Sequence, residues 1–308
     1  MKTQNILDQM ILVVLNISLW QGRKALQMND LALNGIDVDK LPPESLATLG
    51  SKRIISPDAL KPFVALKRTA KRFCLKSGVR FGGDGYAIPR EQAEALSQEL
   101  NKIKSEFEVA KTNFLSIYED EVEKWIASNQ PEWSPIIRAA VDTPNHIKKA
   151  ISFNYAAFDV KAPANIAENG LEEEVNNLFG QLCHEVRLVA RRVFEKTFVG
   201  KQEVTFKALS PIMTIREKLV GLQFLDQSIT DTIQIIDDTF SIIPADTAIK
   251  GTDLNMVAGL VGRQLANMGR PVATDADEED LEFPGEDQAL DEIVSQDTGK
   301  VVPITWDF

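Results

Sequence analysis

The longest unbroken pattern of apolar and polar positions in this chain lies between residues 91 and 130. Its apolar residues recur at alternating steps of three and four, at Ala93, Leu96, Leu100, Ile103, Phe107, Ala110, Phe114 and Ile117. This spacing is that of an amphipathic helix with a heptad seam. The intervening positions are mostly glutamate, glutamine and lysine, which favour helix and stay solvated. We therefore predict one long spine helix over 91–130, either as an arm of an antiparallel helical hairpin or as a seam for another subunit.

Strand signals occur only in the first half of the chain. Residues 10–20 alternate apolar and polar side chains and are rich in β-branched types, which predicts a strand, and 152–160 alternate in the same way. The segments 79–81 and 86–88 flank four residues that include three glycines. That arrangement is typical of a β-hairpin.

The remaining periodic segments indicate helices. Ser56-Pro57 is a helix start, and Gly78 is a helix stop. The predicted helices, besides the spine and a short turn over 44–49, are 57–77, 171–200, 210–240 and 252–268, the last capped by Thr252. We expect no strand between residues 171 and 268.

These elements predict a mainly α protein. The expected fold is a long antiparallel helical bundle or coiled coil, with a small α+β N-terminal part and a disordered acidic C-terminal tail. The predicted parts are 1–90 with a basic helix, the spine 91–130, a connecting segment 131–170 with a strand, a helical bundle 171–270 and the tail 271–308.

Negative charge is concentrated in the tail. Twelve of the 45 acids and one of the 34 bases lie from Pro271 onward, which leaves 33 of each in the rest of the chain. The net charge of -11 thus describes the tail and does not exclude a nucleic-acid surface elsewhere. The final eight residues are apolar again, so we expect a docking peptide on an acidic tether, with Ile304, Trp306 and Phe308 as its contact residues.

Residue types that carry chemistry are sparse. The two histidines, His146 and His184, lack a partner at metal-ligand spacing. The two cysteines, Cys74 and Cys183, lie in helical patterns far apart, which favours structural roles in a reducing cytoplasm. The sequence contains no run of eighteen apolar residues, so we predict no membrane-spanning helix. We therefore expect no catalytic residue, metal or cofactor, and no membrane association.

The strongest binding signal is basic. Residues 52–81 contain nine bases and one acid, Asp58. The predicted contact residues of this basic face are Lys67, Arg68, Lys71, Arg72, Lys76 and Arg80. Such a face can bind the phosphates of a nucleic acid without recognising its nucleotide sequence. It can equally meet an acidic partner or the chain's own tail, or be plain solvated surface.

Several short motifs in the first half resemble a known family. They are Leu15-Asn16-Ile17-Ser18-Leu19-Trp20 with Gly22-Arg23-Lys24, then Leu41-Pro42-Pro43, Leu49-Gly50-Ser51-Lys52-Arg53, Gly78-Val79-Arg80-Phe81 and Tyr86-Ala87-Ile88-Pro89. In this order they resemble the DUF3150 family of phage and conjugative-element proteins, which has no established activity. Its members tend to be encoded near a MoxR-type AAA+ ATPase, so the resemblance implies a partner in an ATP-driven assembly and no catalytic residue.

These observations give three function hypotheses. The leading one is a non-enzymatic, cytoplasmic adaptor or scaffold protein of a mobile genetic element that works with the AAA+ ATPase. The alternative is a DNA-binding accessory factor that uses the basic helix 57–77. A third reading is a hydrolase with an unrecognised carboxylate site. A homo-oligomer through the spine helix is compatible with the first.

Overall fold

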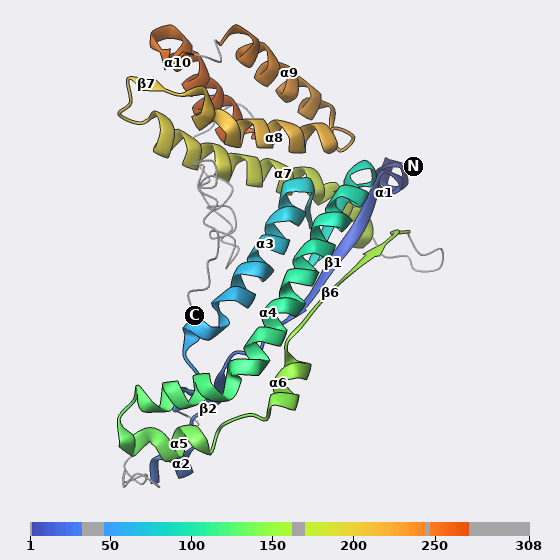
Figure 1. Ribbon diagram of the computed structural model, residues 1–308. Helices are drawn as coiled ribbons and strands as arrows, with labels where there is room; N and C mark the ends of the chain where they lie inside the picture. Colours follow the sequence, from blue (N-terminus) through green and yellow to red (C-terminus); the bar gives the residue numbers. More distant parts are fainter. Residues whose placement is uncertain (1, 33–45, 162–169, 244–246, 271–308) are drawn as a thin grey trace. The chain divides into compact units, whose positions relative to one another are not determined.

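The computed structural model describes residues 2–32, 46–161, 170–243 and 247–270 (Figure 1). The chain divides into two compact units that alternate along the sequence. Unit 1 comprises Met1–Val14, Lys71–Glu99 and Ala156–Phe308, and unit 2 comprises Leu15–Ala70 and Leu100–Tyr155. The division predicted in sequence order, with limits at 90, 130, 170 and 270, stays a prediction.

Helices make up most of the described chain. They are α1 (Lys2–Asp8), α2 (Met28–Ala32), α3 (Lys61–Ser77), α4 (Ala93–Ala127), α5 (Ser134–Arg138), α6 (Pro144–Ala150), α7 (Gly170–Val193), α8 (Ser210–Gly221), α9 (Gln227–Ile242) and α10 (Gly251–Gly259). Single helical turns with 3-10 or π geometry are η2 (Pro57–Leu60), η3 (Arg90–Gln92), η4 (Pro131–Trp133), η5 (Phe194–Phe198), η6 (Phe206–Leu209), η7 (Leu260–Gln264) and η8 (Leu265–Asn267). No helix among the described residues is both long and apolar enough to cross a membrane. The prediction of a mainly α-helical protein is confirmed.

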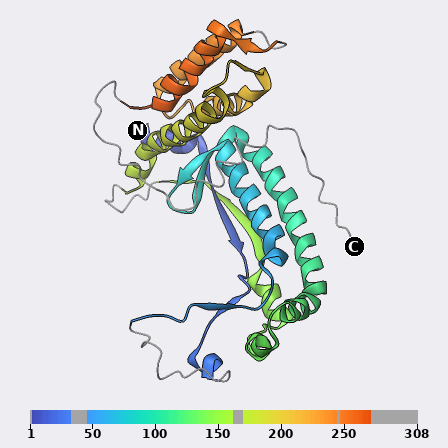
Figure 2. The same cartoon turned by 90° about the vertical axis from the view of Figure 1, so that its left-hand side faces the viewer.

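The main sheet has four strands in the order β4-β5-β1-β6. Its strands are β1 (Met10–Ser18), β4 (Val79–Phe81), β5 (Gly85–Pro89) and β6 (Ser152–Phe158). The predicted hairpin is confirmed, since β4 and β5 pair antiparallel with Phe81 opposite Gly85. β5 also pairs antiparallel with β1, from Met10 opposite Pro89 to Val14 opposite Gly85. Figure 2 shows this hairpin in cyan beside the blue β1.

Two small antiparallel sheets were not predicted. β2 (Arg23–Ala25) pairs with β3 (Ser51–Arg53), and β7 (Glu203–Val204) pairs with β8 (Ile249–Lys250). The second pair contradicts the expectation that residues 171–268 contain no strand. Strands of two or three residues are too short for an alternating pattern to reveal them.

The core of unit 2 is aromatic and depends on the spine helix. Phe63 contacts Phe107 at 5.2 Å between ring centroids, and Trp20 meets Tyr118 edge-on at 5.8 Å. The predicted seam is buried from Leu96 to Phe114 except for the half-buried Ala110, but Ile117 is 44 % exposed and Tyr118 takes its place. A straight helix drifts against a strict heptad repeat, so the buried row moves to the next position.

The core of unit 1 joins α1, the β4–β5 hairpin and α7–α10. Its apolar members include Leu7, Val79, Leu182, Val186, Ile212, Leu219, Ile229, Ile236, Val257 and Val261, all buried. The helices predicted over 171–200, 210–240 and 252–268 supply most of these residues, through an apolar stripe on each. The stripes alone do not fix how the helices are joined.

The prediction of one continuous helix over 210–240 is wrong. α8 ends at Gly221, and α9 starts after Asp226, whose carboxylate accepts a hydrogen bond of 2.9 Å from the backbone nitrogen of Ser228. Leu222 and Leu225 between the two helices are buried. Because the connecting residues serve the same core, the apolar spacing continues through the break.

Two other predicted helix positions need correction. α10 starts at Gly251, which has a φ of 56°, and its N-cap is Lys250 rather than Thr252. Of the helical turn expected over 44–49, the described part from residue 46 is not helical. By contrast, Ser56 caps η2 and α3 ends at Ser77, as predicted. The tail 271–308 lies outside the described residues.

Candidate functional site

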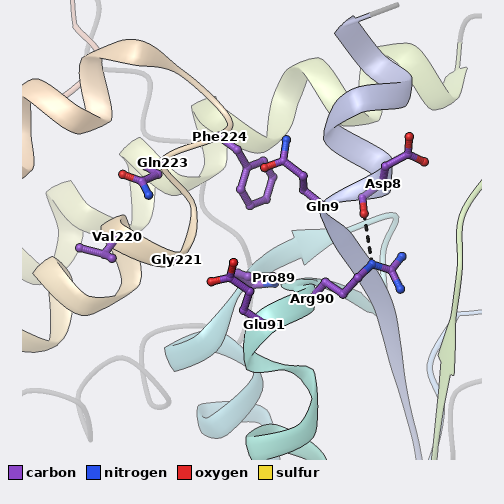
Figure 3. A pocket seen from close by; sticks show the side chains of 9 residues that line it. All are labelled: Asp8, Gln9, Pro89, Arg90, Glu91, Val220, Gly221, Gln223 and Phe224. Carbon is purple, nitrogen blue, oxygen red and sulfur yellow. Dashed lines mark hydrogen bonds between the residues drawn. The ribbon is translucent and has the colours of Figure 1, made fainter.

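A pocket of about 350 Å³ lies in unit 1 where three turns of the chain meet. The first turn joins α1 to β1, the second joins β5 to α4, and the third joins α8 to α9. Figure 3 shows the lining residues, which are Asp8, Gln9, Pro89, Arg90, Glu91, Val220, Gly221, Gln223 and Phe224. Loops held by a rigid scaffold are common positions for binding residues, so this pocket is the candidate site.

Arg90 joins the first two turns. Its backbone nitrogen donates to the carbonyl of Gln9 at 2.9 Å, and its Nε donates to the carbonyl of Asp8 at 3.1 Å, the contact dashed in Figure 3. Its Nη2 donates to the carbonyl of Met10 at 3.3 Å. Asp8 is the last residue of α1, so a cation here also complements the negative end of the helix.

The outer side of Arg90 is paired with Asp159. Nη2 of Arg90 lies 2.7 Å from Oδ1 of Asp159, and the two side chains are 50 % and 64 % exposed. The hydrogen bond from Arg90 holds the pKa of Asp159 below its ordinary value. Arg90 therefore acts mainly as a brace for the pocket wall, and in Figure 3 its side chain extends towards Asp8 rather than towards Phe224.

The third turn supplies an apolar wall. Phe224 projects between Gln223 and Gln9, with Val220 on the same turn (Figure 3). Gly221 permits close approach of this turn, because a Cβ there would lie 2.3 Å from Nε2 of Gln92 and 3.4 Å from Cγ of Pro89. The result is an apolar surface bordered by amide and carboxylate groups.

The two carboxylates that line the pocket are not directed at a common point (Figure 3). The carboxylates of Asp8 and Glu91 point in different directions in Figure 3, so they do not address one substrate atom together. Nε2 of Gln4 donates to Asp8 at 2.8 Å. Within the described ranges, no group of three His, Cys, Asp or Glu side chains could hold a metal ion. The pocket's volume of about 350 Å³ lies at the lower end of the range for ligand pockets.

A family model described as "Protein of unknown function (DUF3150)" matches residues 7–265. The chain belongs to the DUF3150 family. No curated protein and no solved structure matches it. The DUF3150 match spans every residue that lines the pocket, from Asp8 to Phe224, whereas the acidic tail lies beyond it.

The predicted basic face lies on α3 and β4 of this DUF3150 chain. Lys76 is exposed, and the other five predicted residues, Lys67, Arg68, Lys71, Arg72 and Arg80, are half-buried. Nζ of Lys67 donates to the carbonyl of Ile17 at 3.5 Å, and the guanidinium of Arg72 lies 5.8 Å from the ring centroid of Phe73. These side chains thus contribute to packing as well as to surface charge. The predicted docking residues Ile304, Trp306 and Phe308 lie outside the described residues.

The two cysteines, Cys74 and Cys183, are free and buried. Burial raises the pKa of Cys74 to about 12 and that of Cys183 to about 11, so neither thiol is a thiolate at neutral pH. The glycine cluster forms the hairpin turn, where Gly82 and Gly83 have φ angles of 53° and 65°.

Sequence reasoning did not find the pocket. Its residues come from three separate parts of the chain, and no motif spacing connects Asp8, Arg90 and Phe224. One signal was present, since Asp226 followed by Ser228 is a helix N-cap pattern that marks the third turn.

Proposed function

We propose that this chain is a non-enzymatic adaptor of a mobile genetic element and that its pocket beside Arg90 binds a protein partner. The observation that supports this most is the construction of the pocket. Arg90 joins the first two turns, Gly221 lets the third turn approach them closely, and the third turn presents Phe224 and Val220 within a polar border. Protein recognition commonly uses an apolar anchor point of this kind surrounded by hydrogen-bonding groups.

The proposed partner is the MoxR-type AAA+ ATPase encoded near DUF3150 members. The family association supports this choice. The apolar end of the tail offers a second contact, with Ile304, Trp306 and Phe308 carried on a strongly acidic segment. Two weak contacts on one chain raise the overall affinity through effective concentration. The phage or conjugative origin, the cytoplasmic location and an antiparallel coiled coil around α4 belong to the same proposal.

A charge placed in the pocket tests the adaptor function. Val220 lines the pocket and is 38 % exposed, while Val199 lies outside it and is 59 % exposed. We expect Val220→Glu to weaken binding of the purified ATPase at least tenfold and the matched Val199→Glu to leave it unchanged. Equal affinity of both variants for the ATPase would remove the pocket from the proposal.

Binding of DNA is the second candidate function. It is supported by α3, whose seventeen residues include six bases and no acid. Lys61 and Lys76 are exposed, so their replacement by glutamine removes charge without disturbing the core. The DNA hypothesis predicts weaker binding and a smaller salt dependence for this double variant in an electrophoretic mobility assay. An intact chain that retards no DNA at low salt would exclude this function.

The hydrolase remains the third and least supported reading. Its possible carboxylates in the pocket are Asp8 and Glu91, which point in different directions. Replacement of both by the corresponding amides should abolish any hydrolysis detected in the purified chain.

A further inference from the structure

The two edges of the main sheet are built differently. The edge strand β4 has three residues, includes Arg80 and packs against α7. The other edge strand, β6, has seven residues with the sequence Ser-Phe-Asn-Tyr-Ala-Ala-Phe, which contains no charge and no proline. Among the described residues, no strand pairs with the outer side of β6. Figure 1 shows β6 next to β1.

An edge of this kind is a template for another strand. Folded proteins usually protect a sheet edge by charge, proline, a bulge or a short strand, because its unpaired N–H and C=O groups otherwise recruit further chains. β4 has two of these protections, namely its short length and Arg80. β6 has none of the charge, proline or length protections along its seven residues.

Side-chain contacts hold β6 in an extended form. Phe153 packs against Phe107 of α4 at 5.4 Å between ring centroids. Within the same unit, the hydroxyl of Tyr155 donates to Oδ1 of Asn101 at 3.1 Å. A strand that is already ordered loses little conformational entropy when it pairs. At its end, Ala157 is exposed and Phe158 is 51 % exposed.

We propose that two copies of this chain pair through β6, antiparallel about a two-fold axis. Pairing centred on Tyr155 sets Phe153 opposite Ala157 of the second copy and Asn154 opposite Ala156, so that large and small side chains alternate across the seam. The paired strands themselves carry no charge, although Lys104 of α4 donates to Oδ1 of Asn154 at 3.1 Å beside the seam. The contact is isologous and closes with two copies. The two four-stranded sheets become one sheet of eight strands.

Introduction of a charged side chain at Ala157 tests the pairing in the full chain. Wild-type mass, measured by light scattering or sedimentation, should rise with concentration from 34.2 kDa towards twice that value. Ala157→Lys and Ala157→Glu should each remain monomeric, because the pairing sets either charge opposite Phe153 of the second copy. Phe158→Lys, at a side chain that is already half exposed, should also be monomeric. This second variant shows whether loss of the dimer is specific to a structural change at residue 157.

A matched control lies on the spine helix. Val109 of α4 is 61 % exposed, and Val109→Lys should leave the wild-type dimer intact. The proposal is overturned if the wild type stays monomeric at its highest soluble concentration, if Ala157→Lys still dimerises, or if Val109→Lys alone disrupts the dimer. The last result would assign self-association to α4. An extended peptide as the occupant of β6 would leave the wild-type chain monomeric. None of these outcomes depends on the pocket beside Arg90.

Discussion

The ammonium group of Lys218 on α8 donates a hydrogen bond of 2.7 Å to the main-chain carbonyl of Leu75 in the last turn of α3. The same group is paired with the carboxylate of Glu185 on α7, and both charged side chains are only 10 % exposed. The last carbonyls of a helix lack partners within the helix, so Lys218 acts as a distant C-terminal cap. The contact fixes the point where α3 leads through Gly78 into the hairpin.

Removal of the Lys218 charge should destabilise the chain strongly. Lys218→Met leaves the Glu185 carboxylate and the Leu75 carbonyl buried without this donor. The expected loss in the free energy of unfolding is roughly 3 to 5 kcal/mol. Urea denaturation checks this. The double variant Lys218→Met with Glu185→Leu should recover much of the loss, because no charge then remains buried. A double variant less stable than Lys218→Met would contradict the explanation.

Asp142 should give unit 2 part of its acid sensitivity. Its carboxylate accepts a hydrogen bond of 3.0 Å from Nε1 of Trp20 and lies 2.8 Å from Nζ of Lys24. Burial raises the pKa of Asp142, but the bonds from Lys24 and Trp20, with the charges of Lys24 and His146, outweigh it and bring the pKa below 3.8. A lowered pKa stabilises the fold above pH 3.8, and this contribution is lost as the pH falls through the folded-state pKa.

We therefore expect Asp142→Asn to lower stability at neutral pH and to have less effect as the pH falls below 3.8. Unfolding curves between neutral and acid pH measure this difference. Asp159→Asn is a suitable control, because Asp159 is exposed and its pair with Arg90 is screened by solvent. If the difference between wild type and Asp142→Asn stays constant with pH, the Asp142 carboxylate does not have the assigned role.

Gly78 should tolerate no side chain. A Cβ at this position would lie 2.1 Å from the carbonyl oxygen of Ala87 and 2.6 Å from Cδ1 of Ile88. Gly78→Ala should lower the free energy of unfolding by roughly 3 kcal/mol through overpacking against the backbone. Gly83 has open space and a φ of 65°, so Gly83→Ala should lose only about 1 kcal/mol through backbone strain. Thermal denaturation of both variants separates the two effects, and equal losses would refute the steric argument.

Arg90 should matter more for the pocket than its charge pair suggests. Arg90→Met removes the donors to the carbonyls of Asp8 and Met10 and should lower the free energy of unfolding by about 1 kcal/mol. Asp159→Asn keeps those two bonds and should have a smaller effect. The two variants are compared by urea denaturation. Similar losses would mean that the exposed ion pair, rather than the main-chain contacts, holds the turns together.

The tail should contribute to binding and not to the fold. Residues 271–308 are rich in acidic and small side chains, a composition that does not favour a packed core. Deletion of residues 272–308 should therefore leave the unfolding transition unchanged while it reduces recovery of the ATPase in a pull-down. Unchanged recovery would remove Ile304, Trp306 and Phe308 from the proposed interface.

Local signals predicted many of the elements. The Ser56 cap, the Gly78 stop and the glycine turn each act within a few residues, and the structure has all three. The heptad pattern of α4 was long enough to outweigh local preferences for other structures, so the helix was predicted correctly. The burial predicted for Ile117 was wrong, because helical geometry departs from the heptad repeat there. The strands β7 and β8 were not predicted, because each has only two residues and an alternating pattern cannot be recognised over so short a segment.

Tertiary relationships could not be predicted in the same way. The break between α8 and α9 was hidden because Leu222 and Leu225 continue the apolar spacing through the turn. The pocket needs that turn, together with residues near positions 8 and 90, and one sequence holds no record of which turns meet. The Lys218–Glu185 pair was missed for the same reason, since its partners lie 33 residues apart on different helices.

Amide hydrogen exchange of the full chain, with and without the purified ATPase, measures whether the ATPase binds at the pocket beside Arg90. We expect slower exchange at the three pocket turns, around residues 8–10, 89–92 and 220–225, when the ATPase is bound. Val220→Glu should abolish this protection. Binding of the ATPase with unchanged exchange at all three turns would show that the pocket is not the ATPase-binding site.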